Sequence, residues 1–164
     1  MALLLRVVTK PKWAKPDWMK TDDIPADALT DLRSDENKLS VWSVEPDQSD
    51  LDSALIAVAS GREHLDKLDY ALLDEQVLPA LAIEYAKSEG DSPYLAAKST
   101  MHRDLIRLTV RKVARLAEEM MPLERVRVSE KEIKLKLLEA LRGGMLDRAR
   151  IKQKLLADLE PPRS

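Results

Sequence analysis

Three charged residues in the middle of the chain have the types that a metal-dependent nuclease uses. Asp74 ends one apolar segment, and Glu84 and Lys87 lie in the next. In such enzymes an Asp and a Glu-x-Lys pair together hold Mg²⁺ and a water. Here the spacing is Glu-x-x-Lys, and because side chains alternate along a strand, Glu84 and Lys87 should point to opposite faces. The pattern favours a polar edge strand, and a divalent-metal nuclease is only the third hypothesis for function.

The two histidines, His64 and His102, give little support for a metal site. His64 follows the end of a predicted helix and His102 lies next to Asp104. Neither belongs to an HExxH motif or to any other spacing typical of zinc ligands. We therefore expect surface or capping roles for both, and the sequence predicts no metal and no cofactor.

Other catalytic motifs are also missing from the sequence. The chain has no Cys and only four Gly, so it offers no thiolate chemistry and no glycine-rich phosphate loop. It also lacks the GxSxG motif of serine hydrolases. A Ser–His–Asp site assembled from distant residues stays open, because geometry defines such triads. The sequence leans towards a non-enzymatic role.

A lysine- and tryptophan-rich segment, residues 9–20, is a candidate binding arm. Its prolines lack a backbone N–H donor, so the segment should not form a regular helix or strand. Aromatic rings interleaved with cations could stack bases and neutralise phosphates along a single strand. Alternatively, the tryptophans could pack on the protein's own core, which is the interpretation we favour. The candidate residues for nucleic-acid binding here are Lys12, Trp13, Lys15 and Trp18.

A second basic feature is a row of arginines at four-residue spacing in a predicted long helix, residues 101–121. Its members are Arg103, Arg107, Arg111 and Arg115. Such a ridge could contact phosphates, or it could face the acidic half of the same protein. An intramolecular partner is the expectation we adopt.

The last two predicted helices form an αα-hairpin around Gly143 and Gly144. Helix-turn-helix binding of DNA is one interpretation, with basic candidates Arg148, Arg150 and Lys152. The other is packing against a protein partner or a second copy through apolar residues. The candidates for that interaction are Leu137, Leu141, Ile151 and Leu155.

The elements that would position these residues follow from periodicity and from turn residues. Strands are expected at residues 3–8, 38–44, 68–74 and 82–88, with a helix at 51–61 that makes a parallel crossover. A short strand is possible at 124–128, and Ser129 with Glu132 predicts a capping box. The fold class is therefore α+β or α/β. We expect a small mixed sheet of three to four strands, followed by a helical C-terminal region.

Charge divides the chain into an acidic α/β part, residues 1–95, and a basic helical part, residues 96–164. The first has ten Lys and Arg against nineteen Asp and Glu, a net charge of −9, and the second has seventeen against ten, a net charge of +7. We expect one domain with a helical appendage. The start, MALLLRVV, is too short for a signal peptide and no apolar run could span a membrane, which predicts a cytoplasmic protein.

These observations give two main hypotheses for function. The first is an accessory protein that binds a protein partner, or a second copy of itself, through the C-terminal helices. The second is a nucleic-acid-binding protein that uses the basic helices and the Trp/Lys arm.

Overall fold

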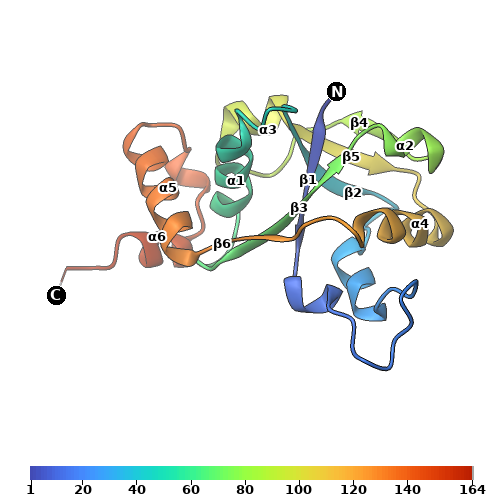
Figure 1. Ribbon diagram of the computed structural model, residues 1–164. Helices are drawn as coiled ribbons and strands as arrows, with labels where there is room; N and C mark the ends of the chain where they lie inside the picture. The colour runs from blue at the N-terminus through green and yellow to red at the C-terminus, as the bar shows by residue number, and fades with distance from the viewer. Residues whose placement is uncertain (164) are drawn as a thin grey trace.

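A single antiparallel sheet of six strands organises the chain (Figure 1), as the computed structural model of residues 1–163 shows. The strand order is β4-β5-β2-β1-β3-β6. Their bounds are β1 (Leu3–Val8), β2 (Leu39–Val44), β3 (Leu68–Asp74), β4 (Glu84–Lys87), β5 (His102–Ile106) and β6 (Val126–Val128).

Helices cover both faces of this sheet. The α-helices are α1 (Leu51–Ser60), α2 (Val77–Ala80), α3 (Leu95–Thr100), α4 (Val110–Met120), α5 (Glu130–Arg142) and α6 (Gln153–Leu159). Three 3₁₀-helices are η1 (Lys10–Trp13), η2 (Ala26–Leu32) and η3 (Arg148–Arg150).

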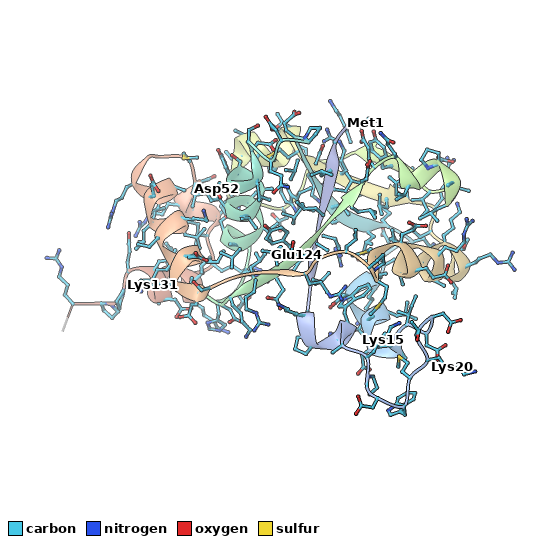
Figure 2. All side chains as sticks on the ribbon, in the orientation of Figure 1. Met1, Lys15, Lys20, Asp52, Glu124 and Lys131 are labelled. Atoms are coloured by element: carbon cyan, nitrogen blue, oxygen red, sulfur yellow. The ribbon has the colours of Figure 1, made fainter. Side chains whose placement is uncertain are left out.

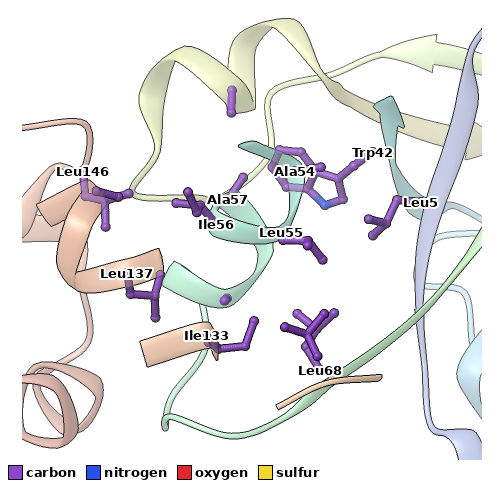
Figure 3. Close-up of a cluster of buried hydrophobic side chains, with 14 of the residues drawn as sticks. Leu5, Trp42, Ala54, Leu55, Ile56, Ala57, Leu68, Ile133, Leu137 and Leu146 are labelled. Atoms are coloured by element: carbon purple, nitrogen blue, oxygen red, sulfur yellow. The ribbon is translucent and has the colours of Figure 1, made fainter. Parts of the chain in front are cut away.

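The period-two pattern of the strands builds two separate cores. In β1, Leu5 faces the core under α1, α3, α5 and α6, while Leu4 and Val8 face the core under η1, η2, α2 and α4. Figure 3 shows part of the first core, where Leu55 of α1 and Ile133 of α5 lie near Leu68 of β3. The result is three layers, with the sheet in the middle.

Several predicted elements are confirmed, but the two strands joined by the predicted parallel crossover do not pair with each other. Strands form at residues 3–8, 39–44 and 68–74, and β4 lies at an edge of the sheet as expected. The capping box of α5 is present, with Ser129 accepting from the Glu132 amide and Glu132 accepting from the Ser129 amide. Strands β2 and β3 run in the same direction, yet β1 lies between them and pairs antiparallel with each.

The predicted mixed sheet of three to four strands is therefore wrong. The main cause lies in residues 101–121, which were expected to be one helix. Residues 102–106 instead form β5, which pairs with β2 on one side and β4 on the other. Arg107 then adopts a positive φ of 53°, and Thr109 caps the shorter helix α4. Tertiary pairing overrides a local pattern that fits either structure.

The C-terminal hairpin also differs in detail from the sequence prediction. The expected last helix, residues 146–159, is divided into η3 and the shorter α6, with Ile151 between them. Helices α5 and α6 do pack against each other.

The acidic and basic parts of the chain share one sheet. Strands from both sides of residue 95 form it, since β5 and β6 pair with strands of the acidic part.

Within residues 1–163, the helices are too short or too polar to cross a lipid bilayer.

Candidate functional site

An open groove of about 730 Å³ lies between η2, the turn at residues 33–38 and the first turns of α4. Its walls come from segments far apart in the sequence, with Leu29 and Arg33 on one side and Val110 and Val113 on the other. Leu108 is buried at 5% exposure and also lines the groove. The groove is thus a tertiary feature of the fold.

Local backbone geometry explains why the walls stand where they do. Glu36 and Asn37 have φ values of 50° and 58°, and they form a tight turn closed by the Asp35–Lys38 bridge. The Leu108 amide donates to the Asn37 carbonyl at 3.0 Å, which ties this turn to the start of α4. Both walls therefore belong to one hydrogen-bonded unit.

Two large apolar side chains at the groove are exposed to solvent. Val110 occupies the first position of α4 and is 89% exposed, and Leu29 of η2 is 42% exposed. The neighbours of Leu29 in η2, Ala28 and Leu32, are buried against the sheet and α4. Leu29 and Val110 are therefore apolar groups on opposite walls of the groove that the protein's own core does not use.

The charged residues that line the groove, Lys12 and Arg33, are both cations. Arg111 and Lys112 follow Val110 in the first turn of α4, and that turn has no acidic residue. Because a helix N-terminus is itself positive, cations there are unfavourable unless an anion is near. In the described part of the chain, Arg33, Arg111 and Lys112 have no carboxylate within 4.0 Å.

A buried carboxylate holds the η2 wall in place. Asp31 is 8% exposed and accepts hydrogen bonds from the Thr9 amide at 2.6 Å and from Trp13 Nε1 at 2.8 Å. The Arg6 guanidinium donates to the Asp31 carbonyl at 2.6 Å. Burial lowers the pKa of Arg6, and the charge of Asp31 partly opposes this effect. The network joins β1, η1 and η2, so the groove rests on a rigid support.

The two tryptophans of the predicted arm differ in environment, because only Trp13 belongs to this network. Trp13 is buried at 1% exposure beneath the Arg125 guanidinium, which lies 5.6 Å from the ring centroid, so its packing in the core is confirmed. Trp18 is 80% exposed. Lys12 lies 3.7 Å from Asp31, and Lys15 folds back to donate to the Thr21 carbonyl. The expectation that the tryptophans pack on the core is therefore confirmed for Trp13 and wrong for Trp18, and the two rings do not share one surface.

The predicted arginine ridge is wrong, because its residues do not share a helix. Arg103 lies on β5, where it donates to the Thr100 carbonyl. Arg107 precedes α4 and pairs with Glu84 at 3.3 Å. Only Arg111 and Arg115 belong to α4, and Arg115 donates to the carbonyl of Ala80.

The basic candidates of the C-terminal hairpin have internal partners. Arg148 pairs with Glu160, and Arg150 pairs with Asp147 at 3.5 Å. Lys152 lies 3.8 Å from Glu63.

The apolar candidates of the same hairpin belong to the protein's own core. Leu137, Ile151 and Leu155 are at most 5% exposed, and Leu141 is half-buried beside them (Figure 3 shows Leu137). A partner could not reach these side chains without displacing α5 or α6.

The nuclease-like residues do not form a site in the described chain. Asp74 ends β3, whereas Glu84 and Lys87 lie on β4, and three other strands separate β3 from β4 in the sheet. Residues 1–163 contain no group of three or more His, Asp and Glu side chains arranged to hold a metal ion.

The two histidines have different environments. His64 Nδ1 lies 3.3 Å from Asp158 on the surface. His102 is buried, with its ring edge-on to Trp42 at a centroid distance of 5.0 Å and its Nδ1 2.9 Å from Ser88 Oγ. Burial lowers the pKa of His102, although Asp104 partly opposes the shift. The expected surface role is therefore confirmed for His64 and wrong for His102, whose ring is part of the protein's packing.

Comparisons of the chain with protein-family models, with curated proteins and with solved structures gave no match. The case for the groove as a site therefore rests on its geometry. Sequence reasoning missed its central residues Leu29, Arg33 and Val110. The only local signals were Thr109 as a helix cap and the Glu36-Asn37 turn.

Proposed function

We propose that this chain is a non-enzymatic interaction protein whose groove binds a segment of a partner protein. The observation that carries the proposal is the pairing of exposed Leu29 and Val110 with a lining whose charged residues are cations. An apolar side chain of the partner would enter between the groove walls, and acidic residues beside it would meet Arg33 and the first turn of α4.

The proposal keeps the class of function expected from the sequence but moves its surface. The interaction was expected at the hairpin of α5 and α6. The burial of Leu137 and Leu155 supports a structural role for that hairpin instead. The groove belongs partly to the same basic half of the chain, since α4 supplies one wall. A cytoplasmic location remains our expectation for such a protein.

A peptide titration tests this function. The probe is a fluorescently labelled synthetic peptide with one Trp flanked on both sides by Asp, and the matched peptide has Lys in place of each Asp. We expect the acidic peptide to bind and the basic one not to bind. The affinity should fall as salt is raised, because exposed charges are screened.

Two charge-reversed variants locate the binding surface. Arg33→Glu reverses a charge in the groove, and Lys131→Glu reverses a charge at the start of α5, which does not line the groove (Figure 2 labels Lys131). Arg33→Glu should weaken binding of the acidic peptide by roughly tenfold, while Lys131→Glu should leave it unchanged. Equal loss in both variants, or preference for the basic peptide, would refute the proposal. Binding of single-stranded RNA or DNA in place of the acidic peptide would favour the nucleic-acid hypothesis.

A further inference from the structure

The loop between η1 and η2, residues 14–25, presents one tryptophan to solvent. It includes the second half of the predicted Trp/Lys segment, residues 9–20, and we call this loop the arm. Trp18 is 80% exposed, although Trp is among the side chains that gain most from burial. The arm forms a loop that projects from the body beneath α4 (Figure 1), and Figure 2 labels Lys15 and Lys20 on it. Trp is enriched among the residues that supply most of the binding energy of protein interfaces, which makes an exposed Trp on a projecting loop a candidate docking anchor.

The arm is held in shape by its own hydrogen bonds. The Met19 amide donates to the Pro16 carbonyl at 3.0 Å, and the Lys20 amide donates to the Asp23 carboxylate at 3.2 Å. Its two ends are fixed by buried Trp13 and buried Pro25. An arm that is already ordered loses less conformational entropy when it docks, so more of its contact energy appears as affinity.

The charge of the arm indicates what kind of surface it fits. Residues 14–25 carry Lys15 and Lys20 against Asp17, Asp22 and Asp23, a net charge of −1. This balance disfavours nucleic acids and anionic membranes. Asp17 and Asp22 are exposed and form no hydrogen bond or ion pair within the described chain. The arm thus carries an apolar anchor next to unpaired carboxylates.

These properties match the groove, and we infer that the arm of one copy docks into the groove of a second copy. Trp18 would enter between Leu29 and Val110, and Asp17 would face Arg33 or the first turn of α4. The inference rests on the proposed function and names the partner. It also gives the charge split a physical role, because an acidic segment of the front half would meet cations of both halves.

The position of the arm favours a closed dimer. The arm leads directly into η2, which is one wall of the groove, so the arm and the groove lie at the same end of the molecule (Figure 1). With a two-fold axis at that end, the arm of each copy would bind in the groove of the other copy. Such reciprocal exchange closes after two copies, whereas head-to-tail docking would continue into a chain.

Analytical ultracentrifugation of the full chain over a wide concentration range tests the dimer. We expect a monomer–dimer equilibrium for the wild-type protein. Trp18→Ala, which lacks the arm anchor, and Val110→Glu, which blocks the groove, should each weaken the dimer by roughly tenfold or more. Leu135→Ala removes another exposed apolar side chain, on α5, and should change nothing. Circular dichroism of each variant checks that the fold is intact.

Mixing the two variants gives the decisive result. Trp18→Ala keeps an intact groove and Val110→Glu keeps an intact arm, so the mixture should form heterodimers held by one arm–groove contact. A wild-type protein that stays monomeric, a dimer that Trp18→Ala does not weaken, or a mixture that fails to associate would overturn the inference. If the wild-type protein is monomeric but its groove still binds the acidic Trp peptide, the proposed function survives and only the second copy is excluded.

Discussion

The two basic regions of the C-terminal half differ in how their side chains are satisfied. In the hairpin of α5 and α6 the core-facing Leu137 and Leu155 are buried, although Leu135 on the outer side of α5 is exposed. Five cations of this hairpin have carboxylate partners: Lys136, Arg148, Arg150, Lys152 and Lys154. At the first turn of α4 an apolar residue is exposed, and Arg111 and Lys112 have no such partner in the described chain. A stretch that is apolar and basic in sequence can therefore be structural in one place and available for binding in another.

The largest expected effect is a difference in stability between a substitution in the hairpin of α5 and α6 and one at the first turn of α4. Leu155 is fully buried, so Leu155→Ala should destabilise the protein by about 2–5 kcal/mol through lost burial and a cavity. Val110→Ala removes an exposed side chain and should change stability by no more than about 0.5 kcal/mol. Urea unfolding of both variants measures the difference. Similar destabilisation by both would mean that Val110 is part of the core.

The next effect concerns the support of the groove. Asp31→Ala leaves Trp13 Nε1 and the Thr9 amide without their acceptor and should cost about 2–4 kcal/mol of stability. Asp27→Ala, at an exposed position of the same 3₁₀-helix, is the matched control and should cost far less. Thermal unfolding of the two variants provides the measurement. Equal losses would show that the network does not hold the arm and η2.

A smaller effect is a dependence of stability on pH through His102. Its pKa is lowered from 6.5, chiefly by burial, so below that pH the unfolded chain binds a proton that the folded protein resists. Stability should therefore be retained above about pH 6.5 and decline as the pH falls below it. Urea unfolding across this range should show a weaker decline in His102→Gln, while His64→Gln, on the surface, serves as the control. An unchanged pH dependence in His102→Gln would contradict this assignment.

The smallest effect has opposite signs for stability and binding. Arg111→Glu places an anion in the first turn of α4, which has none, and should stabilise the protein by about 0.3–1 kcal/mol. The same change should weaken binding of an acidic peptide. Thermal unfolding and a peptide titration on one sample would reveal this trade-off. A variant that is less stable, or that binds the acidic peptide more tightly, would contradict the role given to the charge of this turn.

The parts of the fold that the sequence predicts are those with strong local patterns. The short apolar runs at residues 3–8 and 68–74 and the Ser129–Glu132 capping box are such cases. Strand β5 was missed because Arg103 through Ile106 fit helical spacing equally well, and only pairing with β2 and β4 decides between the two structures. The crossover was misjudged because a strand from the start of the chain fills the space between β2 and β3.

The candidate site could not be predicted for a similar reason. Leu29 and Val110 are far apart in the sequence, and nothing local indicates that they face one groove. Trp13 is buried and donates to Asp31, a residue outside the segment 9–20, so that segment alone does not show which of its two tryptophans is buried. Basic residues were visible in the sequence, but their partners were not, since Arg148 and Lys152 pair with Glu160 and Glu63.

One titration tests the central claim, that the groove beside α4 is the binding surface. The labelled acidic Trp peptide is added to two variants that carry the same substitution, Val110→Glu in the groove and Leu135→Glu on exposed α5. The account predicts that Val110→Glu abolishes the rise in fluorescence anisotropy and that Leu135→Glu binds like the wild-type protein. Undiminished binding by Val110→Glu, or equal loss in both variants, would contradict it.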